Sequence, residues 1–393
     1  MERRGETGTS PGNHRPLERG ARRLFRRYPA HRTGPPVFPG PAMSRTRCQG
    51  RKTQPASTRL PSERQAKPSR TCSAGNPSLP PRKRGGSWPA ARAAMTGAKG
   101  KGRAVKIGFH TDAFNSAYWS FDKCLEWAQR HQVHWIECGL IDGVSWIHGL
   151  GYQPHVALYE DPVLLRRKME RYGVRFSQVD AAFPLSQEDG PLRGVPYVMK
   201  AIAWAAHAGC PCVDTTDGLH APEGMTESEV MAQMRRSYQQ ILRVAEAHRV
   251  IVNIEPHGYF TTRPGYLAEM LAFSDSACLR LNMDTGNTFI AGQDPADFLA
   301  RFLPRVSHVH VKDVSESLAR SLRGGLTGIA VSHCPLGQGV NAENIRRCLR
   351  LLRDAGYTGV LSIECEGAGG PMLEESLAWL RSTLRELGIV ESS

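Results

Sequence analysis

The sequence has ten cysteines but no CxxC pair, so zinc-finger and disulfide-framework spacings are both missing. It also has no apolar run of about 18 residues, which excludes an ordinary membrane-spanning helix. No apolar core of about 7–15 residues follows the N-terminal arginines, so we expect no secretory signal. Scattered cysteines without such a signal are typical of a reducing compartment. We therefore expect a cytoplasmic protein whose cysteines are small buried hydrophobes.

Acidic residues are scarce in the first quarter of the chain. Residues 1–103 hold 24 Lys and Arg against 4 Asp and Glu, whereas residues 104–393 hold 27 against 33. The net charges are +20 and −6, so the pI of about 9.5 describes the N-terminal extension and not the remainder. The extension is rich in Arg, Pro, Gly and Ser and lacks apolar periodicity, so it cannot offset its ordering entropy by burial. We predict that residues 1–103 are a disordered extension or an over-long start, with Met95 as a candidate start.

In residues 104–393, short β-branched runs alternate with longer amphipathic stretches. Eight such units, each of roughly 36 residues, predict a parallel sheet of the size that closes into a (β/α)8 TIM barrel. A doubly wound open sheet is the alternative, but it usually has a Gly-rich turn after its first strand, and here that turn reads HTDAFNS. The expected strands are 105–109, 134–138, 174–180, 212–215, 250–255, 278–284, 306–310 and 360–364. The clearest expected helices are 120–131, 226–248, 294–303 and 342–355.

Polar residues follow almost every expected strand. In a barrel, the carboxyl ends of the strands form the active face. An unpaired charge at the end of a buried strand costs several kcal/mol of folding free energy. Several such charges at the same end of a barrel therefore indicate that they share a bound partner. The polar residues at these ends are Glu137, Asp180, Asp217, His220, Glu255, His257, Asp284, Asn287, His308, His310, Lys312, Asp313, Glu364 and Glu366.

A single divalent cation could bind the three carboxylates and the imidazole at the ends of the last four strands. Three carboxylates and one imidazole suit Mn²⁺ first, with Mg²⁺, Co²⁺ or Zn²⁺ as alternatives, because geometry and supply decide among them. We predict one ion held by Glu255, Asp284, His310 and Glu364.

Several neighbouring residues have a structural interpretation as well as a functional one. His308 shares a strand face with His310, and we interpret it as a core histidine. Glu366 is either a solvated loop charge or a residue of the site. Glu137 is either packed at the rim of the barrel or a residue of the site. Lys312 and Asp313 are candidates for substrate binding, although they could simply pair with each other.

The remaining substrate-binding candidates are His257, Asn287, His220 and Trp146. His257 follows the strand-ending Glu255 by two residues and is expected to face the same pocket. Trp146 lies in the long segment 139–155, which is either a substrate lid or packing over the barrel rim.

The combination Glu-Pro-His at 255–257, Asp-Thr-Gly-Asn at 284–287, His-Val-Lys-Asp at 310–313 and Ile-Glu-x-Glu at 363–366 resembles the xylose isomerase-like TIM barrel superfamily. This sugar phosphate isomerase/epimerase family includes ketose 3-epimerases, inosose isomerases and dehydratases. The resemblance covers about residues 105–386. It implies the same four metal ligands, with Glu255 and Glu364 as the catalytic acid/base pair.

The sequence departs from the ketose 3-epimerase pattern at three positions. Thr261, Asn287 and Glu316 stand where those relatives carry Glu, His and Arg. The resemblance therefore implies a metal-dependent isomerase or epimerase of a sugar, keto-sugar or inosose, acting through a metal-bound enediolate, but makes a plain ketohexose 3-epimerase a poorer fit. The alternative is a lyase or dehydratase on a keto-sugar, inosose or 3-keto-glycoside.

Two other classes fit the residues less well. A phosphodiesterase like the endonuclease branch of the superfamily would need more histidine ligands, and the −6 charge of residues 104–393 disfavours nucleic acid. A non-catalytic sugar-binding barrel would not need all four ligand positions filled. We therefore expect a small sugar or polyol as the partner and no membrane, and we leave homo-oligomerisation open.

Overall fold

The computed structural model describes residues 104–114, 119–142, 154–325, 327–367 and 369–392. The predicted disordered extension, residues 1–103, and the lid candidate Trp146 lie outside these ranges. Within them, no helix is both long and apolar enough to cross a membrane.

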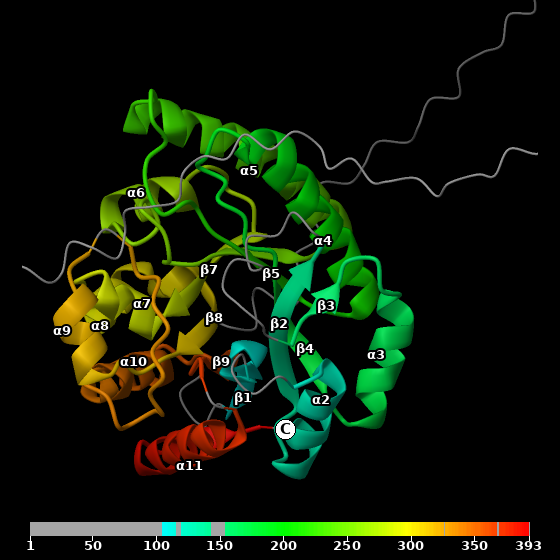
Figure 1. The fold of residues 1–393 in the computed structure, drawn as a ribbon, viewed down its shortest axis with the longest axis vertical. Coiled ribbons are helices and arrows are strands. Elements are labelled where there is room, and N and C mark those ends of the chain that lie inside the picture. Colours follow the sequence, from blue (N-terminus) through cyan, green and yellow to red (C-terminus); the bar gives the residue numbers. More distant parts are fainter. Residues whose placement is uncertain (1–103, 115–118, 143–153, 326, 368, 393) are drawn as a thin grey trace, which may run out of the picture. The chain divides into compact units, whose positions relative to one another are not determined.

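Eight parallel strands in the described part of the chain close into a barrel (Figure 1). They follow the order β1-β2-β4-β5-β6-β7-β8-β9, and β9 closes the ring by pairing with β1 from Lys106↔Val360 to Phe109↔Ile363. This confirms the predicted TIM barrel. The strands are β1 (Ala104–His110), β2 (Trp135–Ile141), β4 (Arg175–Asp180), β5 (Cys212–Thr215), β6 (Ile251–Ile254), β7 (Leu279–Asp284), β8 (Val306–Val311) and β9 (Val360–Ile363).

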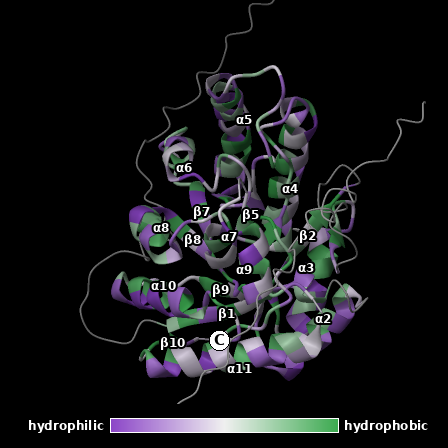
Figure 2. Ribbon diagram, turned by 60° about the vertical axis from the view of Figure 1, so that its left-hand side comes forward, coloured by the Kyte–Doolittle hydropathy of each residue, from purple (hydrophilic) through white to green (hydrophobic). Residues whose placement is uncertain are grey.

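Helices follow the strands and surround the barrel (Figure 1). Figure 2 shows hydrophilic and hydrophobic residues interleaved along α10, whose buried side chains include Ile345, Leu349 and Leu352. This is the one-sided apolar pattern expected of a helix packed against a sheet. The helices are α2 (Phe121–Arg130), α3 (Pro162–Arg171), α4 (Val195–Ala208), α5 (Glu227–His248), α6 (Pro264–Leu271), α7 (Thr285–Ile290), α8 (Pro295–Phe302), α9 (Glu316–Leu322), α10 (Ala342–Asp354) and α11 (Gly370–Glu386).

Side-chain caps explain where several helices begin. Ser120 accepts a hydrogen bond from Lys123 N at the start of α2, and Thr226 forms a full capping box with Glu229 before α5. Asp294 caps α8 ahead of Pro295. Helix positions could be predicted because these signals are local.

The end of β2 corrects the sequence prediction. We expected this strand to end at 137–138, but it continues to Ile141 because Gly139 pairs with Asp180 of β4, and Leu140 and Ile141 pair with β3 (Val156–Ala157). Glu137 therefore lies inside the barrel, fully buried, and not at its rim. Two short strands were also missed, β3 (Val156–Ala157) and β10 (Val390–Glu391), since two residues carry no readable periodicity.

Candidate active site

The four predicted metal ligands meet at the carboxyl ends of β6, β7, β8 and β9. One ligand atom from each of Glu255, Asp284, His310 and Glu364 lies within 4.8 Å of the other three. The Nδ1 atom of His310 is 2.9 Å from Glu364 Oε2, 3.2 Å from Glu255 Oε1 and 3.7 Å from Asp284 Oδ2. All four side chains are buried, so the charges concentrate in a low-dielectric space.

This donor set fits a divalent cation. Asp284 caps α7 with Oδ1, which accepts hydrogen bonds from Gly286 N and Asn287 N at 2.7 Å each. Its Oδ2 and the Oε2 of Glu364 are buried and make no well-aligned hydrogen bond with the described residues, although both lie near His310 Nδ1. Buried carboxylate oxygens with nothing to accept are costly, and a cation would satisfy them.

Burial and charged neighbours shift the pKa values of the ionisable groups in the cluster. Burial opposes ionisation of Glu255, but His257 and His310 lower its pKa to about 2. Burial likewise opposes ionisation of Glu364, yet Lys312 and His310 hold its pKa well below the usual value. Burial would lower the pKa of His310, but Glu137 and Glu364 raise it well above the ordinary value. Without a cation, a protonated His310 balances the surrounding carboxylates.

Glu137 lies on the other side of the His310 ring from the carboxylate cluster. Its Oε2 is 2.8 Å from His310 Nε2 and accepts a hydrogen bond from Ser362 Oγ at 3.1 Å. Its Oε1 accepts from Gln178 Nε2 at 2.7 Å. A carboxylate on one ring nitrogen orients the other nitrogen toward a metal. Glu137 therefore contacts the candidate ligand His310 from inside the barrel and does not lie on a packed rim.

A cavity of about 70 Å³ opens beside the cluster. The predicted residues His257 and Lys312 line it, together with Glu255 and Glu364. Glu366 also lines it and pairs with Lys312, so it is not a solvated loop charge. Among the residues that the structure describes, the lining consists of His110, Asp112, Asp180, Glu255, His257, His310, Lys312, Ile329, Ala330, Val331, Glu364 and Glu366.

The other predicted substrate residues differ in their placement. Asn287 Nδ2 donates to Glu255 Oε1 at 3.1 Å and so orients a predicted ligand. Asp313 is buried and accepts from the backbone of Val314, Gly337, Gly339 and Asn341, so it organises a loop and does not pair with Lys312. His220 is exposed and does not line the cavity.

His308 is buried, as expected for a core histidine. Its Nδ1 contacts Asn282 Oδ1 at 3.1 Å. It does not line the cavity.

Sequence reasoning missed the contribution of the first strand. His110 and Asp112 line the cavity, with His110 Nδ1 3.0 Å from Asp112 Oδ1. Burial opposes the charge on His110, but Asp112 raises its pKa to about 10. The available signal was the spacing His-x-Asp at a strand end, which parallels His-x-Lys at 310–312.

Thr261, the residue that departs from the ketose 3-epimerase pattern, makes a structural contact. Its Oγ1 accepts hydrogen bonds from the backbone N–H groups of His257 and Gly258, at 2.9 Å each, and donates to Asp217 Oδ1 at 2.6 Å. Thr261→Val keeps the shape but leaves these buried groups unpaired. We expect it to lower the free energy of unfolding by about 1–3 kcal/mol in urea denaturation. Thr261→Ser should retain stability, and a Val variant as stable as the parent would contradict this role.

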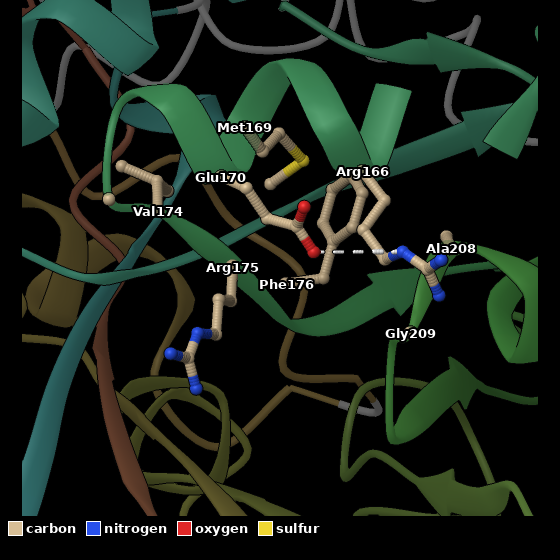
Figure 3. Close-up of a pocket in the computed structure, with 9 residues that line it drawn as sticks. Arg166, Met169, Glu170, Val174, Arg175, Phe176, Ala208 and Gly209 are labelled. Carbon is tan, nitrogen blue, oxygen red and sulfur yellow. Dashed lines mark ion pairs between the residues drawn. The ribbon is translucent and has the colours of Figure 1, made fainter. Parts of the chain in front are cut away.

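A larger cavity of about 420 Å³ lies where β4 begins (Figure 3). Val174, Arg175 and Phe176 line it, and Arg166 pairs with Glu170 across 3.7 Å. It is at the amino end of the barrel strands, the face associated with stability, and so is separate from the metal cluster.

Comparisons with known proteins agree with this architecture. A family profile described as "Xylose isomerase-like TIM barrel" matches residues 108–383. A human protein named as a hydroxypyruvate isomerase is 27% identical over 244 residues, which cover 57% of this chain and 80% of that protein. An inosose dehydratase from Bacillus thuringiensis (strain Al Hakam) is 35% identical over 52 residues, only 13% of this chain and 17% of the relative. The crystal structure of a xylose isomerase domain protein from Planctomyces limnophilus matches 73% of this chain and 99% of its own, with a TM-score of 0.56 at 21% identity, which shows a shared fold.

Proposed function

The chain belongs to the xylose isomerase-like TIM barrel family, and from this premise we propose a divalent-metal-dependent isomerase or epimerase of a sugar, keto-sugar or inosose. The observation that carries the proposal is the convergence of Glu255, Asp284, His310 and Glu364 beside a cavity lined by ionisable groups. A human relative named as an isomerase supports the same reaction class.

The two catalytic carboxylates in this proposal are Glu255 and Glu364. They approach His310 from β6 and β9, with β7 and β8 between them, and both line the cavity. A cation held by Glu255, Asp284, His310 and Glu364 would polarise a carbonyl and its neighbouring hydroxyl and so acidify the C–H of the carbon that carries the hydroxyl. One ionised carboxylate removes that proton and leaves an enediolate. Return of a proton to the opposite face epimerises the substrate, and return to the neighbouring carbon isomerises it.

The surrounding residues keep these carboxylates ready as bases. Lys312 Nζ is 3.3 Å from Glu364 Oε1 and favours its ionised form. Asn287 fixes Glu255 from the other side by donating to Oε1. His257 lies 3.7 Å from Glu255 Oε2 and lines the cavity, where it can orient a substrate hydroxyl.

A lyase is the second candidate. The same proton abstraction yields a dehydratase if a β-hydroxyl leaves from the enediolate. An inosose dehydratase among the relatives favours this reading. Product analysis separates the two reactions.

The proposal is tested by metal content and hydrogen exchange together. The full chain is analysed for bound metal by mass spectrometry and incubated in D₂O with ketoses, inososes, hydroxypyruvate and 3-keto-glycosides. We expect about one ion per chain, lost in His310→Ala, and deuterium next to a carbonyl. Bound metal without exchange for any compound would contradict the enzymatic proposal, and absence of both would leave a binding barrel.

Metal binding is expected to release a proton at neutral pH. The raised pKa of His310 keeps its imidazole protonated in the metal-free protein, and a cation at Nδ1 displaces that proton. The Kd for Mn²⁺ should therefore fall about tenfold per pH unit as the pH rises toward that pKa. Calorimetry in buffers of different ionisation enthalpy measures the proton directly. A Kd independent of pH between about 6 and 8 would contradict this expectation.

A further inference from the structure

A series of hydrogen-bonded polar side chains crosses the barrel interior and ends at His310. Ser307 Oγ, on β8, donates to Asn253 Oδ1, on β6, at 2.5 Å. Asn253 Nδ2 donates to Gln178 Oε1, on β4, also at 2.5 Å. Gln178 Nε2 donates to Glu137 Oε1, on β2, at 2.7 Å, and Glu137 Oε2 lies 2.8 Å from His310 Nε2. We call Ser307, Asn253 and Gln178 the polar layer.

The polar layer occupies positions that are mostly apolar in barrels of this architecture. Counted around the ring from β1, its residues come from the third, fifth and seventh strands. Such barrels are filled by layers of side chains from alternate strands, in which Val, Ile and Leu dominate. Gln178 and Asn253 are fully buried, and buried amides lower stability unless their hydrogen bonds are all made. Their presence in the core therefore indicates a role other than packing.

The hydrogen bonds of the polar layer run in one direction, which Glu137 sets. An ionised carboxylate can only accept, so Gln178 must present its NH2 group to Glu137. The amide oxygen of Gln178 then faces Asn253, which must donate through its own NH2 group. Asn253 Oδ1 is left to accept from the hydroxyl of Ser307. Each residue thus fixes the orientation of the next, and the last group to be fixed is the carboxylate that contacts His310.

The Glu137 carboxylate is held at both oxygens. Oε1 accepts from Gln178, and Oε2 accepts from Ser362 Oγ at 3.1 Å. The contact of Oε2 with His310 Nε2 keeps a proton on that ring nitrogen and leaves Nδ1, which lies 2.9 Å from Glu364 Oε2, to bind a cation. Without the bond from Gln178, the carboxylate could rotate and weaken its contact with His310.

We propose that Gln178 and Asn253 are positioning residues of the metal site, which act on His310 through Glu137. The polar layer keeps the Glu137 carboxylate in the orientation that prepares His310 as a ligand. Neither Gln178 nor Asn253 is among the described residues that line the cavity. The inference rests on the proposed function, because it requires a cation at His310, and it deepens that function by naming residues that control how tightly the cation binds.

The test measures metal affinity and the state of the His310 ring in the full-length protein. Gln178→Met keeps the length of the side chain but removes the donor to Glu137. We expect the Kd for Mn²⁺, measured by calorimetry, to rise about three- to tenfold, less than for a change of Glu137 itself. In the Zn²⁺-loaded protein, the proton on His310 Nε2 should give a downfield NMR resonance that is missing in His310→Ala. This resonance should move upfield in Gln178→Met, because the charge-assisted hydrogen bond weakens.

A double-mutant cycle shows whether Gln178 acts through Glu137. In the Glu137→Gln background, Gln178→Met should change the Kd by less than about twofold, because the carboxylate that Gln178 positions is already gone. Fully additive effects would overturn the inference. Asn253→Leu, which has a similar shape, should shift the Kd and the resonance in the same directions as Gln178→Met, and it carries the test if Gln178→Met does not fold.

Gln233→Met is the matched control. Gln233 lies on α5, outside the ring of strands, and its Nε2 likewise donates one hydrogen bond, to Gln187 O at 2.9 Å. It should keep the parent Kd and resonance, and circular dichroism checks that each variant is folded. A Kd in Gln178→Met no higher than in Gln233→Met would overturn the inference.

The same measurements separate this inference from the proposed function. A Kd that responds to Gln178→Met, in a protein that exchanges hydrogen in no substrate, would contradict the proposed function and support the inference. Substrate turnover with an unchanged Kd in Gln178→Met would do the reverse. A parent protein without affinity for a divalent cation would overturn both.

Discussion

Glu364→Gln is expected to lower kcat by about 10²–10⁴ at saturating Mn²⁺. The amide keeps the shape of the side chain but cannot accept the substrate proton, and it weakens one ligand. Glu364 is buried and held ionised by Lys312 and His310, so a neutral replacement loses both functions. Initial rates and deuterium exchange at several metal concentrations separate the loss of the base from the loss of metal affinity.

Glu386→Gln is the matched control for that variant. Glu386 ends α11, pairs with Arg346 at the surface and is remote from the cavity lining. Its rate should equal that of the parent protein. If Glu364→Gln kept more than about half of the parent rate, Glu364 would not be the base.

Glu137→Gln is expected to weaken Mn²⁺ binding about 10–100-fold without unfolding the barrel. A glutamine accepts only a neutral hydrogen bond from His310 Nε2, so the ring nitrogen facing the carboxylates becomes a poorer ligand. Metal affinity is measured by calorimetry, independently of activity. Circular dichroism checks that the variant is folded.

Asp214→Asn provides the comparison for Glu137→Gln. Asp214 is equally buried in the barrel but makes no hydrogen bond to His310 in the described structure. It should leave metal affinity unchanged. Equal weakening in both variants would mean that any buried carboxylate matters and that Glu137 has no specific role in orienting His310.

Much of the fold could be read from the sequence because its signals are local. Alternating β-branched and amphipathic runs gave the eight barrel strands, and Ser120, Thr226 and Asp294 marked helix starts. The four-ligand cluster could also be predicted, since parallel strands place Glu255, Asp284, His310 and Glu364 at one end of the barrel whatever their side-chain details.

Other features needed the three-dimensional arrangement. The end of β2 depended on pairing with β4, so Glu137 was expected at a strand end, whereas it lies beneath His310 in the barrel. Asp313 and His220 follow strands like true site residues, but the former caps loop amides and the latter is exposed.

The sequence by itself determined the barrel and the types of side chain that gather at the carboxyl ends of its strands, because periodicity and residue chemistry act along the chain. Only the tertiary structure decided which polar strand ends share a cavity, which of them support a loop, and which loop residues line that cavity. Those outcomes depend on contacts between segments far apart in sequence, such as Ser332 with Glu366 and His310 with Glu137, whose geometry no local pattern specifies.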